Sequence, residues 1–145
     1  MKGVRIMAKY NETRAYISID GDIYEIHDTC HADQRGNERF LTFVDGDFLV
    51  HRMEILLADP QIADAIINGV RLGEEFILED EAMGYSLAIS HEFGRGYDYP
   101  TLVLKTVCQT LRYFDGEKVM RVFRNGMMQL YRWNRAARQK EVIAW

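Results

Sequence analysis

Four hairpin signals, each an Asp-Gly or Asn-Gly pair, divide the sequence into short segments, and they constrain the fold more than any other feature. They are Asp20-Gly21, Asp45-Gly46, Asp115-Gly116 and Asn125-Gly126. Such pairs favour the positive φ angles of a tight type I′ turn, which reverses one strand onto its neighbour. Most of them lie between residues that alternate apolar and polar. The sequence therefore predicts an α+β protein, mainly an antiparallel sheet built from hairpins, with two or three helices packed on it.

The first half of the sequence holds several strand patterns. Residues 4–9 alternate between two faces, one of them apolar, which predicts a half-buried strand. Residues 15–19 and 23–27 flank the first Asp-Gly pair, and residues 40–44 and 48–51 flank the second. We therefore expect a sheet of about five strands here, with the polar stretch 28–38 as the loop between the two hairpins.

Residues 60–69 carry the clearest helix signals. Asp59 suits the N-cap, and Pro60 loses no hydrogen bond at the first helical position. Gly69 can adopt the left-handed conformation that ends a helix. One apolar stripe should lie on the sheet, and it consists of Ile62, Ala65, Ile66 and Val70.

Residues 101–114 fit two structures. Apolar side chains at helical spacing favour a helix, and they are Leu104, Val107, Cys108 and Leu111. Threonine, valine and aromatic residues in the same segment favour a strand. We assign a helix here, with the strand as the alternative. A further short helix is expected at residues 134–140, capped by Asn134.

The remaining segments predict strands and turns. Residues 75–78 and 85–90 read as a strand pair around the solvated acidic turn 79–81, and residues 94–99 as a mobile loop. Residues 118–124 and 127–133 form a hairpin around Asn125-Gly126. The apolar end, residues 142–145, must pack either on the protein's own core or on a neighbouring subunit.

Composition indicates one globular domain, residues 1–145. The chain has 145 residues, 48% of them hydrophobic, which is enough for a sizeable core. Its two cysteines are too few for a disulfide framework, so we expect a reducing, cytoplasmic environment. No run approaches the roughly 18 apolar residues of a membrane span, and the N-terminus does not resemble a signal peptide.

The charges are unevenly divided along the chain. Residues 1–100 hold 9 Lys or Arg and 19 Asp or Glu, whereas residues 101–145 hold 9 and 3. Such a division can give the folded molecule two faces of opposite sign, which would steer anionic partners or favour head-to-tail association. In the alternative, the two halves interleave in space and their charges pair locally.

A small histidine and cysteine cluster is the candidate metal site. His27, Cys30 and His31 carry imidazole and thiol groups, which bind zinc and other transition metals well. No second ligand pair follows at zinc-finger spacing. The alternative is that His27 meets polar groups or solvent at a strand end while Cys30 fills a gap. No other motif indicates a cofactor, a catalytic serine or cysteine, or a phosphate-binding loop.

The predicted C-terminal hairpin carries basic and aromatic side chains together. Arginine can hold a phosphate by charge-assisted hydrogen bonds, and tyrosine or tryptophan can stack on a base. The set therefore suits an anionic ligand such as a nucleotide, or single-stranded nucleic acid. Its members are Arg121, Arg124, Arg132, Tyr131 and Trp133. In the alternative, the aromatic side chains belong to the core and the arginines line the wet face.

A glycine-flanked arginine gives one more candidate. Arg95 lies between Gly94 and Gly96, and Tyr97 and Tyr99 follow it. The glycines could let Arg95 close over a bound anion, with the tyrosines adding contact area. A simple exposed turn explains the same glycines.

Three functions remain open on these grounds. The first is a non-catalytic intracellular binding protein, an oligomer, that sequesters or occludes a protein partner or a small anionic ligand; some inhibitors encoded by mobile elements act in this way. The second is a metal-dependent hydrolase or nuclease built on His27, Cys30 and His31. The third is a structural subunit of a homo-oligomer whose residues 142–145 swap into a neighbour.

Overall fold

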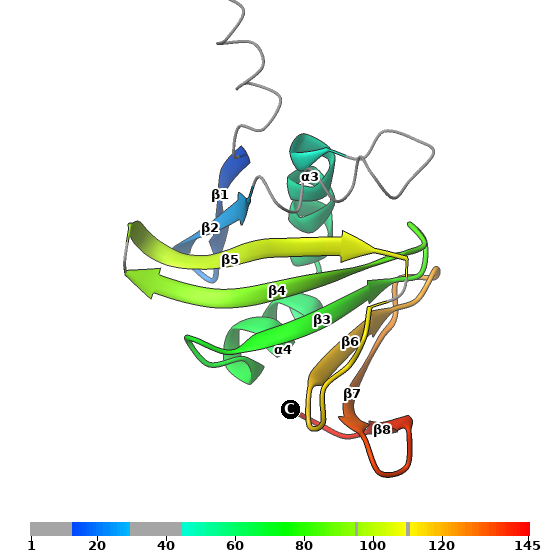
Figure 1. Ribbon diagram of the computed structural model, residues 1–145. Coiled ribbons are helices and arrows are strands. Elements are labelled where there is room, and N and C mark those ends of the chain that lie inside the picture. Colours follow the sequence, from blue (N-terminus) through cyan, green and yellow to red (C-terminus); the bar gives the residue numbers. More distant parts are fainter. Residues whose placement is uncertain (1–12, 30–44, 95, 110) are drawn as a thin grey trace, which may run out of the picture.

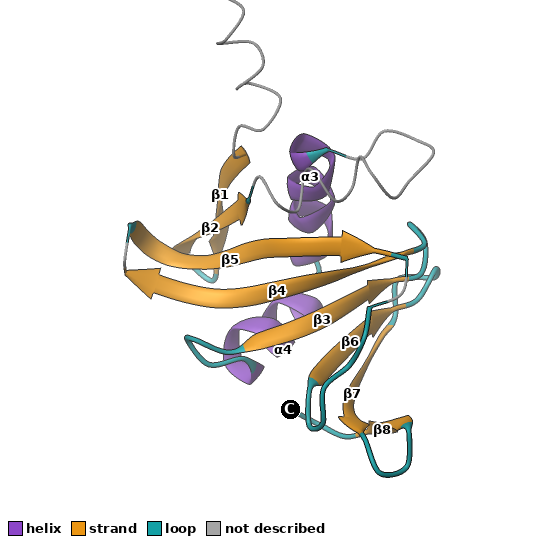
Figure 2. Ribbon diagram, in the orientation of Figure 1, coloured by secondary structure: helices purple, strands orange, loops and turns teal. Residues whose placement is uncertain are grey.

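The computed structural model describes residues 13–29, 45–94, 96–109 and 111–145, and within them it forms one eight-stranded sheet and two helices. Figure 1 shows the arrangement, and Figure 2 distinguishes the helices from the strands by colour. The strand order is β1-β2-β5-β4-β3-β6-β7-β8. In chain order the elements are β1 (Thr13–Ile19), β2 (Asp22–Asp28), α3 (Gly46–Leu57), α4 (Pro60–Gly69), β3 (Glu75–Asp80), β4 (Tyr85–Gly94), β5 (Tyr97–Cys108), β6 (Lys118–Val122), β7 (Met128–Asn134) and β8 (Gln139–Val142).

The sheet is mixed, which corrects part of the expectation. The α+β class is confirmed, and five strand pairs are antiparallel. Two pairs are parallel, β2 with β5 and β3 with β6. Hairpin signals could not indicate these pairs, because parallel strands need a long crossover rather than a tight turn. The parallel pairs join the β1–β2 and β6–β7 hairpins to the central strands β5, β4 and β3.

The hydrophobic core lies between the sheet and the two helices. Its largest fully buried side chains come from both layers, and they include Leu49, Met53, Ile62, Ile66, Phe76, Leu78, Leu87, Ile89, Leu102, Leu104 and Met120. Burying a side chain of this size stabilises the fold by about 1.5–3 kcal/mol relative to leaving it exposed. The helix predicted at residues 60–69 is confirmed, with Asp59 as its N-cap and Pro60 in its first turn.

The hairpin expected at Asp45-Gly46 is wrong, because this pair begins helix α3. The Asp45 side chain accepts a hydrogen bond from the Phe48 backbone N–H at 2.9 Å, as an N-cap residue does. Residues 48–51 are therefore helical rather than a strand. Gly46 is also packed closely, since a Cβ there would overlap the Asp28 carboxylate. The strands expected at residues 4–9 and 40–44 lie outside the described residues.

The helix expected at residues 101–114 is also wrong, because most of this segment belongs to strand β5. A bulge in the pairing of β4 with β5 explains the misleading pattern. Ala88 is paired with Thr106 and Ile89 with Leu104, so Lys105 is an extra residue on β5. The extra residue resets the alternation, so that Leu104 and Val107 both face the core although they are three positions apart.

Other predicted loops and ends differ in detail. The acidic residues Glu79 and Asp80 are buried at the end of β3 rather than in a solvated turn. Strands β4 and β5 extend through Gly94 and Tyr97, where a loop was expected. The helix expected at residues 134–140 is a turn into β8. Gly69 lies within α4 and does not take the left-handed conformation.

The hairpins around Asp20-Gly21 and Asn125-Gly126 are confirmed, as is the strand pair expected at residues 75–78 and 85–90.

Candidate functional site

The predicted basic and aromatic set is divided by the sheet. In β6, Met120 and Val122 point into the core, so Arg121 lies on the opposite face, away from the helices. Arg132 is paired in register with Lys118, whose ammonium group bonds the Gly69 carbonyl of α4. Arg132 therefore lies on the helix side.

On the open face, Arg121 belongs to an ion-pair network with the end of β3. Its guanidinium contacts the Glu79 carboxylate at 3.4 Å and the Glu81 carboxylate at 2.8 Å. Lys140 reaches the same Glu79 at 2.8 Å, and the Tyr113 hydroxyl also donates to it. The hydrogen bond to Glu81 raises the pKa of Arg121 further above its usual range. These contacts occupy the Arg121 guanidinium, which is one of the groups that were expected to hold a phosphate.

The aromatic residues of the hairpin also contact their own chain. The Trp133 ring stacks on Tyr113, with ring centroids 4.8 Å apart. The Lys140 ammonium lies over the Tyr131 ring, 5.3 Å from its centroid. The network and its aromatic neighbours thus join β6, β7 and β8 to one another on this face. Whether Arg121, Tyr131 and Trp133 also meet a ligand stays a prediction.

Local ion pairs connect the acidic first part of the chain to its basic last part. Among the described residues, five ion pairs join the acidic first part to the basic last part, and they are Lys105–Glu75, Lys118–Glu74, Arg121–Glu79, Arg121–Glu81 and Lys140–Glu79. The pairs of Lys118 and Arg121 form because the parallel pairing of β6 with β3 places these basic residues beside acidic ones. The structure therefore favours interleaved charges over two faces of opposite sign.

The backbone of the turn between β6 and β7 is held at several points. The Phe123 N–H donates to the Met127 carbonyl at 2.7 Å, and the Gly126 N–H donates to the Phe123 carbonyl at 2.9 Å. The Asn125 side chain accepts from the Met127 N–H at 3.0 Å. Gly126 has a φ of 91°, which favours glycine.

Glu81 of the β3–β4 turn fixes the start of this segment. Its carboxylate accepts the Arg124 N–H at 2.9 Å and the Arg121 guanidinium at 2.8 Å. The backbone bond from Arg124, followed by the side-chain bond from Arg121, lowers the pKa of Glu81 below its usual value. Glu81 therefore anchors the backbone of Arg124 and leaves its side chain exposed.

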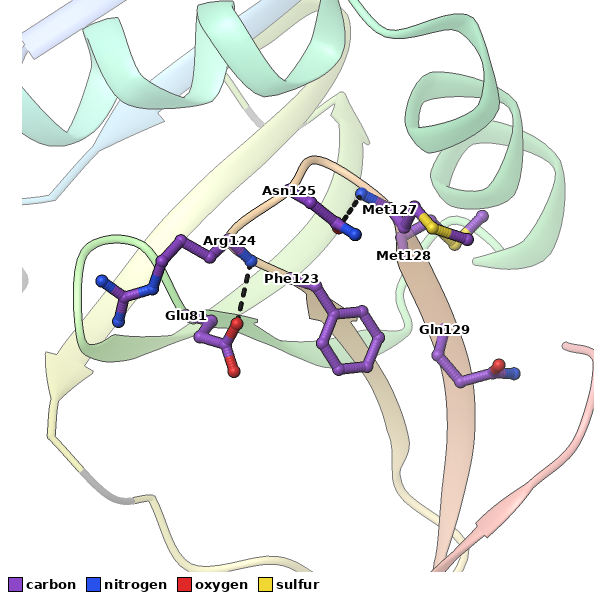
Figure 3. A pocket seen from close by; sticks show the side chains of 7 residues that line it. All are labelled: Glu81, Phe123, Arg124, Asn125, Met127, Met128 and Gln129. Carbon is purple, nitrogen blue, oxygen red and sulfur yellow. Dashed lines mark hydrogen bonds between the residues drawn. The ribbon is translucent and has the colours of Figure 1, made fainter.

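Two hollows open on the sides of this turn. One, of about 380 Å³, is lined mainly by Phe123, Met127 and Met128, with Glu81 and Gln129 at its edge. Figure 3 shows the Phe123 ring between the two methionines and Glu81, and the Arg124 side chain extending to the side opposite the methionines. The other hollow, of about 320 Å³, is shared with helix α3, which contributes Arg52 and Ile55.

We call Ile55, Phe123, Arg124, Met127 and Met128 the turn surface. Met127 is 66% exposed and Ile55 is 50% exposed, although both are apolar. Exposed apolar side chains that cluster around hollows, together with an arginine, are the composition found in the centres of protein interfaces. Sequence reasoning included Arg124 in the basic set but missed its apolar neighbours.

No family model, curated protein or solved structure matches this chain. In the described part of the chain, no helix is long and apolar enough to cross a membrane.

The residues of the predicted metal site are only partly described. His27 is 3% exposed on β2, and its Nδ1 lies 2.5 Å from the Tyr97 hydroxyl of β5. Cys30 and His31 lie outside the described residues. Among the residues that are described, no three His, Cys, Asp or Glu side chains are placed to hold a metal ion. The metal site therefore stays a prediction.

The tyrosines of the glycine-flanked candidate lie against the first two strands, where His27 is also found. Tyr97 contacts His27, and Tyr99 packs edge-on against Tyr16 of β1, with ring centroids 5.9 Å apart. Arg95 lies outside the described residues. The structure thus brings together two predicted sets, His27 and the tyrosines, that no local sequence pattern connects.

Proposed function

We propose that this protein is a non-catalytic binding protein that captures a protein partner through the turn surface. The observation that carries the proposal is the pair of hollows with apolar walls on the two sides of one rigid turn that presents an exposed arginine. The expected partner segment inserts apolar side chains into the hollows and places a carboxylate against Arg124. Arginine forms bidentate pairs with carboxylates, and methionine adapts its shape to the side chain it meets.

A nucleotide is the less favoured ligand at this hairpin. Binding a nucleotide requires a cation for the phosphate and a free aromatic face for the base. Arg121 is paired with Glu79 and Glu81, and Trp133 is stacked on Tyr113. The hollow beside Phe123 is instead lined mostly by apolar atoms from methionine and phenylalanine side chains. These surroundings support a peptide side chain as the occupant.

The held backbone of the turn supports the same proposal. Residues that are ordered before binding lose less conformational entropy when the complex forms, which raises affinity. The three hydrogen bonds within residues 123–127 and the anchor at Glu81 provide this order in the free protein. The surface can therefore act by rigid docking that occludes part of the partner.

Site-specific photocrosslinking in the cells that produce the protein tests the proposal. Met127 is replaced by p-benzoylphenylalanine in one variant, and Val142 in a control variant. The two positions are equally exposed, at 66% and 67%, but Val142 lies on β8, away from the turn surface. We expect position 127 to crosslink to one partner protein and position 142 to give no such product.

Charge reversal then tests the role of the arginine. Arg124→Glu should remove the crosslink from position 127, while Arg135→Glu, an equally large charge change at another exposed position, should preserve it. Circular dichroism checks that both variants are folded. Equal crosslinking from positions 127 and 142, or a crosslink that survives Arg124→Glu, would contradict the proposal. A product of twice the subunit mass would indicate the homo-oligomer instead.

A further inference from the structure

The end of the β4–β5 hairpin folds over the first two strands, which creates a second feature of interest. Tyr97 is paired with Gly94 at the hairpin end, whereas Val103, six residues further along β5, is paired with His27. Tyr97 can reach His27 only if β5 bends back over the sheet. Irregular pairing between Glu92 and Gly94 accompanies this bend. Figure 1 shows both strands curving at this end.

The bend places the Tyr97 phenol between a buried base and a cation. Its hydroxyl lies 2.5 Å from His27 Nδ1. The Arg14 guanidinium lies over the Tyr97 ring, 5.3 Å from its centroid. Arg14 is itself held by the carboxylate of Glu25 at 2.7 Å, and Glu25 is only 2% exposed. The Tyr97 phenol of β5 therefore lies against groups of β1 and β2 that have defined positions.

This geometry is the one that activates a hydroxyl nucleophile. A neutral imidazole within hydrogen-bonding distance can take the hydroxyl proton as the oxygen attacks. A guanidinium over the ring attracts the negative charge that develops on the phenolate. Neither Tyr16 nor Tyr99 has an imidazole contact among the described residues, although Tyr16 is 57% exposed.

We propose that Tyr97 is a nucleophilic site that accepts a phosphoryl-type or sulfonyl-type group from an electrophilic donor, with His27 as the general base. In the step, a bond forms from Tyr97 Oη to the phosphorus or sulfur atom. The bond from that atom to its leaving group breaks, and the leaving group takes the electron pair. The phenolic proton moves to His27 Nδ1. The site is separate from the turn surface, so its test does not depend on the proposed binding function.

An aryl sulfonyl fluoride is a suitable probe, because it reacts with phenolates and releases fluoride. The full chain is treated with a limiting amount, and labelling of each tyrosine is followed by peptide mass spectrometry. We expect Tyr97 to react about tenfold or more faster than Tyr16 and Tyr99, since general base catalysis contributes at least this much. Tyr16 and Tyr99 serve as internal standards of access and folding.

His27→Gln then separates activation from simple exposure. Glutamine keeps a hydrogen-bonding side chain at this position but removes the base. The Tyr97 rate should fall about tenfold or more, while the rates at Tyr16 and Tyr99 stay unchanged. If Tyr97 of the unmodified sequence reacts no faster than Tyr16, the proposal is wrong whatever the variant does. An undiminished Tyr97 rate in a folded His27→Gln variant would overturn it equally.

Discussion

The contact between Gly69 and Trp145 predicts that Gly69→Ala destabilises the protein when Trp145 is present and stabilises it when Trp145 is replaced. Gly69 is the last residue of α4, and a Cβ added there would lie 3.1 Å from Trp145 Cε3 and 3.2 Å from Trp145 Cβ. Both distances are shorter than ordinary van der Waals contact. Trp145 cannot move away freely, because its indole N–H donates to the Tyr131 carbonyl at 3.1 Å and its ring meets Phe76 edge-on.

Two opposing terms set the effect of Gly69→Ala. Alanine is favoured over glycine in a helix and restricts the unfolded chain, which together stabilise by about 0.5–1 kcal/mol. Displacing Trp145 loses part of its packing. Removing a fully buried tryptophan costs about 3–5 kcal/mol, so we assign about 2 kcal/mol to this half-buried one. We therefore expect Gly69→Ala alone to destabilise the protein by about 1 kcal/mol.

The same substitution should stabilise a protein that lacks the indole. In a Trp145→Ala background, Gly69→Ala meets no obstacle, and the free energy of unfolding should rise by about 0.5–1 kcal/mol. The coupling between the two sites is then about 2 kcal/mol, well above the error of additivity for distant sites. Urea unfolding followed by circular dichroism measures all four proteins without depending on tryptophan fluorescence.

Equal effects of Gly69→Ala in both backgrounds would refute the reasoning, because they would show that Trp145 does not rest on α4. The experiment also tests the subunit swap considered for residues 142–145. If the indole comes from the same chain, the unfolding midpoint is independent of protein concentration, whereas a swapped end makes it rise with concentration.

Two further predictions concern charged groups. The Asp80 side chain is fully buried and paired with Arg52 at 2.7 Å. Arg52→Met should therefore lower the free energy of unfolding by about 3–5 kcal/mol, and adding Asp80→Leu should recover most of this loss, as measured by urea unfolding. A double variant as unstable as the single one would count against this prediction. The pKa of Glu81 is lowered in the folded state, so its contribution is present above the usual carboxyl pKa and is lost as the pH falls through and below that range. The stability difference between the unsubstituted protein and Glu81→Gln should therefore shrink from pH 7 to pH 3, and a constant difference would disprove the assignment.

Local turn chemistry predicted two of the four hairpins. Asp115-Gly116 forms a turn, but no strand leads directly into it, and at Asp45-Gly46 the signal was misleading. Asp20-Gly21 and Asn125-Gly126 lie between two alternating segments, so the turn and both strands agree. Asp45-Gly46 has the same residues, but aspartate is also a favoured N-cap. The deciding signal was downstream, where Leu49, Val50 and Met53 follow the spacing of a helix with one buried face.

The misassigned segment 101–114 shows a different limit. A bulge breaks the two-residue alternation of a strand, so its apolar residues can acquire helical spacing by chance. Whether Lys105 is an extra residue depends on its pairing with β4, which is a tertiary property. No local window of sequence contains that information. Parallel pairing of β3 with β6 escaped prediction for the same reason.

The candidate sites were predictable only as single residues. Arg124 could be named because it is basic and next to a turn, but the hollows beside it require the spatial meeting of α3 with the hairpin. The contact of His27 with Tyr97 spans 70 residues and depends on the parallel pairing of β2 with β5. Residue type suggests chemistry, whereas the parallel strands decide which groups meet.

The charge pattern finally limits how the proposed partner can be recognised. Pairing of β6 with β3 neutralises Glu74 and Glu79 with Lys118 and Arg121, so this part of the surface has little net field to guide an approaching molecule. Glu81 bonds the backbone of Arg124 and leaves the guanidinium exposed. One exposed cation beside apolar hollows attracts a partner mainly at contact distance. Affinity at the turn surface should therefore rest on apolar burial and one short-range ion pair, with a weak dependence of the association rate on salt.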